Sequence, residues 1–319
     1  VLQTILDTET VVPAPNNLGS IFNETPSIPR IDISSPLIAS RGNSQPVWTY
    51  TDPITQLETR AGTTGIFTWI NGPLSTGVNT LGNVANANPD LDFSYFQVPS
   101  PAPAGTKFDV FPGSPTMTNG KFIAFKGNFT VTENNVAVGK TGVYFRDISV
   151  AKSPVIAIAD TSTTIPGQAV PFGSTAPPSA AAGKIVFTGL DNEENPTTGG
   201  IYVAPLAERP ALTAIALIGD PVPDRSGVAL VDGSTFTKFG EGLAYDGRYV
   251  TFWGAWGPDM RSLDLVCPTD GNKDRIQYCK DTAPLPGYVT QVQVPVNQGI
   301  FLHDTVSRKT LMVARSGVG

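Results

Sequence analysis

The stretch GKFIAFKGN, residues 120–128, sets a short apolar strand between two glycines, and two close copies of it follow. The copies are GKIVFTGLD at 183–191 and GRYVTFWGA at 247–255, about 64 residues apart. After each copy come a second strand that begins at a glycine and a third apolar strand. The second strands are TGVYFRD at 141–147, GGIYVAP at 199–205 and QGIFLHD at 298–304. Self-similarity at a fixed period is typical of repeat architectures, so the spacing predicts a chain built from one repeated unit.

A more divergent copy precedes these three, within residues 35–83. We therefore predict a single repeat domain over residues 1–319, with four units of about 60 to 95 residues whose loops vary most. The predicted units are 14–83, 84–161, 162–221 and 222–316.

The composition indicates an all-β fold. The chain has 32 glycines and 29 prolines, only 15% charged residues, and no convincing stretch with helical apolar spacing. Short strands that are apolar on both faces need cover on both sides, and radial stacking of small antiparallel sheets supplies it. We predict a β-propeller-like fold of four or five blades.

The N-terminus offers a clue to how the repeat closes. Residues 3–13, QTILDTETVVP, match the last strand and exit loop of a unit, AIADTSTTIP at 157–166, so residues 1–13 are predicted to form an extra outer strand. That strand pairs with the C-terminal unit to close a ring, completes a fifth blade lying beyond Gly319, or inserts into a neighbouring molecule. Ring closure is the outcome that we expect.

The phrases GVYF, GIYV and IADTSTTIPG resemble those of a loosely described family of secreted microbial β-propeller-like repeat proteins of unknown function. The resemblance spans nearly all four units, although the first unit departs from the pattern. It implies a propeller-like fold and export from the cell. The family has no known catalytic set, so the resemblance implies no site residues.

Charge and hydropathy exclude two classes of partner. The formal net charge is −6, and the 21 basic residues form no run, so the chain lacks the basic surface typical of nucleic-acid binding. No apolar stretch approaches the roughly 20 residues that a membrane helix needs. We expect neither a nucleic-acid partner nor a membrane span.

Two features favour a secreted protein. Cys267 and Cys279 lie close together with turn residues between them, which predicts a disulfide contributing on the order of 3 kcal/mol. The alternative is a pair of reduced, buried thiols. Asn23 and Asn128 each begin an N-glycosylation triplet, so we expect a glycoprotein.

The segment between the cysteines also suggests a metal site. Asp270, Asn272 and Asp274 alternate as in the first half of an oxygen-lined calcium loop, although the glutamate that completes such a loop is missing. We keep two hypotheses, a calcium ion bound here or a solvated hairpin tip. No other cofactor is indicated.

A second acidic pattern recurs in the exit loops of the repeats. Asp7, Asp160 and Asp220 are interpreted as one repeat position, where a ring would gather them into an acidic rim for calcium or a polyhydroxylated ligand. The competing interpretation is that each carboxylate accepts hydrogen bonds within its own turn.

Aromatic residues are candidates for stacking on sugar rings. The predicted ligand-binding residues are Trp256, Tyr95 and Phe96. Glycines flank the turn at Trp256, and Tyr95 and Phe96 lie in a long loop. Trp253 lies in a predicted central strand, where core packing is the expected role.

We therefore predict a secreted or cell-surface binding or assembly module without catalytic residues, whose ligand is a glycan or a protein. One alternative is a polysaccharide lyase or glycosidase using His303, Tyr278 or a rim carboxylate as its base. Another is a structural subunit that self-assembles by exchanging its N-terminal strand.

Overall fold

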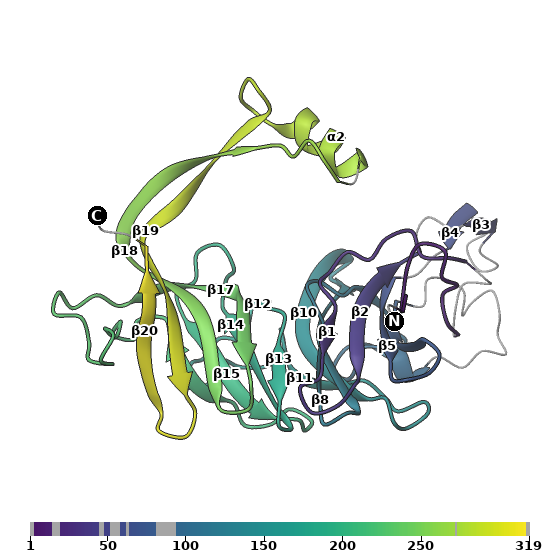
Figure 1. The fold of residues 1–319 in the computed structure, drawn as a ribbon, viewed down its shortest axis with the longest axis horizontal. Helices are drawn as coiled ribbons and strands as arrows, with labels where there is room; N and C mark the ends of the chain where they lie inside the picture. The colour runs from purple at the N-terminus through teal and green to yellow at the C-terminus, as the bar shows by residue number, and fades with distance from the viewer. Residues whose placement is uncertain are drawn as a thin grey trace.

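The computed structural model describes residues 3–14, 20–44, 48–51, 58–61, 64–80, 94–271 and 273–316. In these residues four antiparallel sheets of four or five strands follow one another along the chain and form an arc (Figure 1). The predicted all-β fold is confirmed at this level. Each sheet lies within one of the four predicted units, whose boundaries stay predictions.

The first sheet has the order β1-β2-β5-β6, and its strands are β1 Arg30–Ile31, β2 Ile38–Asn43, β5 Thr64–Trp69 and β6 Ser75–Asn79. The second has the order β11-β10-β9-β7 with β8 also on β9, from β7 Phe108–Val110, β8 Thr116–Thr118, β9 Phe122–Glu133, β10 Val136–Asp147 and β11 Ile156–Asp160.

The third sheet has the order β12-β14-β15-β16 with β13 also on β14, from β12 Ser174–Thr175, β13 Ser179–Ala181, β14 Lys184–Leu190, β15 Gly199–Pro205 and β16 Thr213–Leu217. The fourth has the order β17-β18-β19-β20, from β17 Phe236–Tyr245, β18 Tyr249–Val266, β19 Val289–Asp304 and β20 Lys309–Arg315. The remaining elements are the pair β3 Trp48–Thr51 and β4 Glu58–Ala61, the 3-10 turn η1 Ser94–Phe96, and helix α2 Lys273–Thr282.

A glycine pair at the centre of each sheet explains the repeated sequence. The two middle strands pair glycine with glycine in all four sheets, at Gly42–Gly65, Gly127–Gly142, Gly189–Gly200 and Gly254–Gly299. A Cβ on the first glycine would lie 2.5 to 2.7 Å from a ring carbon of the unit's phenylalanine, which is Phe22, Phe108, Phe172 or Phe236. The glycine therefore makes room for an aromatic ring flat on the sheet.

The structure also shows that the divergent first unit is a true copy. Each sheet has an aromatic residue two positions after the second glycine of its pair, directly after a β-bulge. These residues are Phe67, Tyr144, Tyr202 and Phe301. Each of these rings contacts the phenylalanine on the glycine, with centroids 4.7 to 5.6 Å apart. Burial of these aromatic faces stabilises each sheet, because hydrophobic free energy scales with buried apolar area.

The core consists mainly of layers between successive sheets. One face of a sheet carries small aliphatic side chains and packs against the aromatic face of the next sheet. Ile66 and Phe125 belong to one cluster between the first two sheets, and Ile201 and Phe252 belong to another between the last two. The sequence repeat thus encodes one kind of interface, used three times.

Buried cations also connect the sheets. Arg146 on β10 donates to the carbonyl of Gly77 on β6 at 2.7 Å, and its guanidinium lies over the rings of Tyr95 and Phe96. Lys126 on β9, with 8% of its side chain exposed, reaches Glu241 of the fourth sheet at 3.5 Å. These contacts connect the second sheet to the first and to the fourth.

The expected ring closure is not seen within the described residues. Residues 3–14 pair with no strand of the fourth sheet, whose outer position is filled by β20. Instead Leu6 packs on a small cluster of Val12, Phe22 and Phe67 against the first sheet. Apart from a single bridge between Val11 and Ile21, residues 3–14 contain no strand, so the described part of this segment does not form the predicted outer strand.

Candidate functional site

The most individual feature of the molecule is an arm that leaves the fourth sheet. Up to Trp256, β18 lies between β17 and β19; from Met260 onward it pairs with β19 alone. Gly257, with φ of +74°, and Pro258 lie at the break in register between these two stretches. The two-stranded ribbon is about 30 Å long at the usual rise per residue, and it arches toward the first sheet (Figure 1).

Side chains alternate along a strand, so the arm has two faces, and each exposes apolar side chains. On one face Leu263 pairs with Val292, and Leu265 with Thr290, with 38% and 52% of the two leucines exposed. On the other face Asp264 accepts a hydrogen bond from the amide of Gln291 at 2.9 Å. The face of Asp264 also carries Met260 and Val266, which are 43% and 67% exposed. The arm therefore carries an apolar face that no core cluster of the described residues includes.

The tip of the arm is a helix held by a disulfide. The bond joins Cys267, at the end of β18, to Cys279 on α2, with an S–S distance of 2.03 Å, so the predicted disulfide is confirmed. The prediction of a simple hairpin tip was incomplete, because α2 occupies it. From this helix Arg275 reaches Glu24 of the first unit at 3.7 Å.

The aromatic residues predicted to stack on sugars do not form an exposed platform. Trp256 is 1% exposed and packs edge-on against Phe301 in the core between the last two sheets. Phe96 is also 1% exposed, and Tyr95 is half-buried beneath Arg146. A sugar ring cannot reach a buried aromatic face, so the prediction of stacking on Trp256 and Phe96 needs correction, whereas that on Tyr95 stays a prediction.

The proposed calcium residues are not brought together by any described contact. Asp270 is exposed and accepts a hydrogen bond from the backbone of Gly271. Asn272 lies outside the described residues, as does the side chain of Asp274, whose backbone belongs to α2. The residues that the structure describes contain no cluster of three or more His, Cys, Asp or Glu suited to a metal ion.

The exit-loop aspartates serve their own turns. Asp7 Oδ1 accepts from the hydroxyl of Thr10 at 2.6 Å, and the backbone N–H of Asp7 donates back to it at 3.1 Å. Asp160 repeats the second contact with Thr163 at 3.0 Å. These bonds support local turn stabilisation over an acidic rim.

Asp220 does not occupy the same repeat position as Asp160. In the third sheet the backbone N–H of Leu217 donates to Asp220 Oδ2, three residues later, at 2.8 Å. Leu217 pairs with Gly200 as Asp160 pairs with Gly142. Asp220 is therefore the counterpart of Thr163, and the sequence alignment was wrong by three residues at this loop.

His303 lies inside the sheet stack. It is 7% exposed, its Nδ1 is 2.8 Å from the hydroxyl of Thr310, and burial lowers its pKa from the ordinary value. Its neighbour Asp304 points elsewhere and holds Arg248 at 2.8 Å. The pair thus divides between two faces, as adjacent strand residues must, and a joint role in proton transfer has no geometric support.

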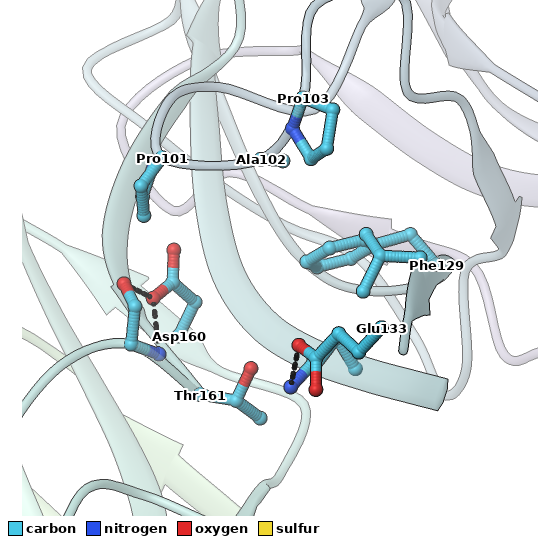
Figure 2. Close-up of a pocket in the computed structure, with 10 residues that line it drawn as sticks. Pro101, Ala102, Pro103, Phe129, Glu133, Asp160 and Thr161 are labelled. Atoms are coloured by element: carbon cyan, nitrogen blue, oxygen red, sulfur yellow. Dashed lines mark hydrogen bonds and ion pairs between the residues drawn. The ribbon is translucent and has the colours of Figure 1, made fainter. Parts of the chain in front are cut away.

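A small pocket opens beside the exit loop of the second sheet (Figure 2). Pro101 and Pro103 form one wall, with a cis peptide bond between Ser100 and Pro101, and Phe129 lies across from them. Its volume of about 140 Å³ is below the usual size of a small-molecule site.

The charged groups of this pocket are engaged with one another. Glu133 pairs with Lys140 at 2.8 Å, and Arg209 donates to Asp160 Oδ2 at 2.7 Å. Burial raises the pKa of Asp160, but hydrogen bonds from Arg209 and Ser162 more than offset this, so the pKa lies below its ordinary value. The arrangement is a structural staple of the exit loop.

The two glycosylation triplets lie in different surroundings. Asn23 is exposed, with its backbone bonded to the carbonyl of Asn43. Asn128 is half-buried on β9, between Thr141 on one neighbouring strand and Val110 on the other. Asn23 is the more accessible acceptor.

No described helix has the length and apolar character needed to cross a membrane. A scan against models of protein families finds no match, and a search of curated proteins finds no relative. The resemblance to secreted microbial repeat proteins therefore stays an expectation.

Proposed function

We propose that the protein is an extracellular, non-catalytic binding module, and that the arm binds a protein partner. The observation that carries the proposal is the arm's apolar face, with Leu263 and Leu265 exposed on a ribbon outside the core. A hairpin with no binding partner would be expected to carry polar residues at positions 263 and 265, because exposed apolar patches favour association.

The tip of the arm adds to this argument. Tyr278 and Tyr288 are 72% and 52% exposed, and tyrosine is enriched at protein interfaces. The disulfide constrains the tip before binding, which lowers the entropy lost when a partner docks. A glycan ligand is less well supported, since Trp256 and Phe96 are buried.

The disulfide and the exposed acceptor Asn23 support export, because disulfides persist in oxidising compartments. The repeated interface between sheets supports the finer description of the fold as four blades of an open propeller.

The test compares binding of labelled protein to the surface and extracellular matrix of the cells that produce it. In the arm-less variant Asn-Gly replaces residues 257–296 and joins Trp256 to Asn297, which are cross-strand partners. We expect at least tenfold weaker binding with the melting transition retained.

A sharper comparison changes one face of the arm at a time. Leu263→Asp with Leu265→Asp should weaken binding like removal of the arm, whereas Ser262→Asp with Gln293→Asp, on the opposite face, should not. Equal binding by all variants would exclude the arm as the binding element.

A further inference from the structure

The outward face of the fourth sheet repeats the face that every earlier sheet buries. The residue after the second glycine of each pair points toward the next sheet, and Ile66, Val143 and Ile201 are each at most 1% exposed there. The fourth counterpart, Ile300, is 40% exposed.

The neighbour of Ile300 on β20 follows the same rule, whereas its partner on β18 is the half-buried Trp253. The earlier sheets carry Arg41, Lys126 and Thr188 at that position. The β20 neighbour, Ala314, is exposed, whereas the equivalent Ala159 and Ala216 are 0% and 4% exposed. Nearby Val313 is 51% exposed. The last sheet thus keeps apolar side chains suited to an interface that the described chain does not cover.

The first sheet presents the complementary face. Two residues before the first glycine of each pair, the later sheets carry buried phenylalanines, Phe125, Phe187 and Phe252, but the first sheet carries Ser40. A hollow of about 400 Å³ opens at this position, partly roofed by residues 3–6. Its floor consists of Ile38, Ser40, Phe67, Trp69 and Leu74.

We propose that the face around Ile300 binds the hollow of the first sheet in a second copy of this chain. The internal layers supply the reason for choosing this occupant. In each of them the face that carries the counterpart of Ile300 packs on the aromatic face of a following sheet. Among the described sheets, the first is the one whose aromatic face has no preceding sheet.

The contact joins different surfaces of the two copies, so it is head-to-tail and generates a ring or a fibre. It does not require exchange of the N-terminal strand, and it does not involve the arm. Residues 3–6 lie over part of the hollow, so they compete with the incoming sheet.

Sedimentation velocity over a wide concentration range tests the proposal. We expect the intact protein to associate, and Ile300→Asp or Val313→Asp on one face, or Ser40→Asp in the hollow, each to weaken association at least tenfold. Val306→Asp, in the exposed turn of the same sheet, is the matched control and should associate normally. Thermal unfolding confirms that each variant is folded.

Mixing decides the geometry. Ile300→Asp keeps an intact hollow and Ser40→Asp keeps an intact outward face, so their mixture should form a one-to-one complex and stop there. Deleting residues 1–6 should retain or strengthen association, whereas strand exchange would lose it. A monomer at every concentration, association unaffected by these variants, or a mixture that stays monomeric would each overturn the proposal. Because the arm is unchanged throughout, these outcomes are separate from the fate of the proposed function.

Discussion

At the scale of single residues, the glycine under each phenylalanine is the most sensitive position of the repeat. A Cβ at Gly189 would lie 2.5 Å from the ring of Phe172, which is fully buried and has no room to move. We expect Gly189→Ala to lower the free energy of unfolding by about 1 to 3 kcal/mol, the usual cost of overpacking. Urea unfolding measures it.

The matched control is Gly139→Ala, on the exposed part of β10, where a Cβ would contact nothing within 4 Å. It should leave stability nearly unchanged or raise it slightly, because alanine restricts the unfolded chain. Similar losses in both variants would show that the ring contact does not explain the glycine.

The staple between Asp160 and Arg209 predicts a pH effect. Because the folded-state pKa of Asp160 is lowered, the carboxylate stabilises the fold above its unfolded pKa, near 4, and this contribution disappears as pH falls through the folded value. Asp160→Asn should cost about 1 to 3 kcal/mol at pH 7.

Urea unfolding at pH 7 and near pH 3 should show the difference between wild type and Asp160→Asn shrinking in acid. Glu133→Gln, which removes an exposed ion pair in the same pocket, should cost less than about 1 kcal/mol. A deficit of Asp160→Asn that stays constant with pH would argue against the ionised staple.

Residue patterns in the sequence revealed the recurring glycines. They did not reveal the phenylalanine ring that lies against the first glycine of each pair. They misplaced Asp220 by aligning it with Asp160. Its counterpart is Thr163, which accepts the same backbone hydrogen bond. The sequence pattern also did not predict which aromatic side chains are buried. Trp256 stands beside a turn glycine in the sequence, yet its ring turns into the core.

At the scale of elements, the disulfide should matter for the arm and little for the sheets. Cys267 and Cys279 close a short loop at the tip, far from the layers between sheets. Replacing both with serine should leave the main melting transition within about 2 °C while speeding limited proteolysis near α2. A large drop in the melting temperature would instead place the arm within the cooperative fold.

The helix α2 shows why the arm was only partly predictable. Its sequence KDRIQYCKDT has a single aliphatic residue, so it offers no apolar period to detect. The disulfide attaches α2 to the end of the arm, a role that packing of an apolar helix face usually performs. The alternation of Leu263 and Leu265 with polar residues, by contrast, is a strand signal that the sequence contains.

At the scale of the whole molecule, a repeat reveals how many sheets a chain builds but not how far they curve. The angle between sheets depends on side-chain volumes in three layers and on long-range ties such as Lys126 with Glu241. Ring closure therefore does not follow from the repeat alone, and the N-terminal segment folds onto the first sheet instead.

The arc is spanned at one further point, where Arg275 of the arm lies 3.7 Å from Glu24 of the first unit. Exposed ion pairs contribute little and are screened by salt, so this contact should act as a weak latch on the arm. Spin labels on genetically encoded residues at positions 278 and 28, both exposed, would report the distance across it.

We expect one dominant short distance in the wild type at low salt, and a broader, longer distribution in 1 M salt or with Glu24→Lys. Adding Arg275→Glu to Glu24→Lys should restore the short distance, because the reversed pair attracts again. Lys280→Glu is the control on the same helix, since its ammonium lies over the ring of Tyr288 rather than near Glu24. If neither salt nor charge reversal changes the distribution, the ribbon itself sets the arm's position, through the break in register at Gly257 and Pro258.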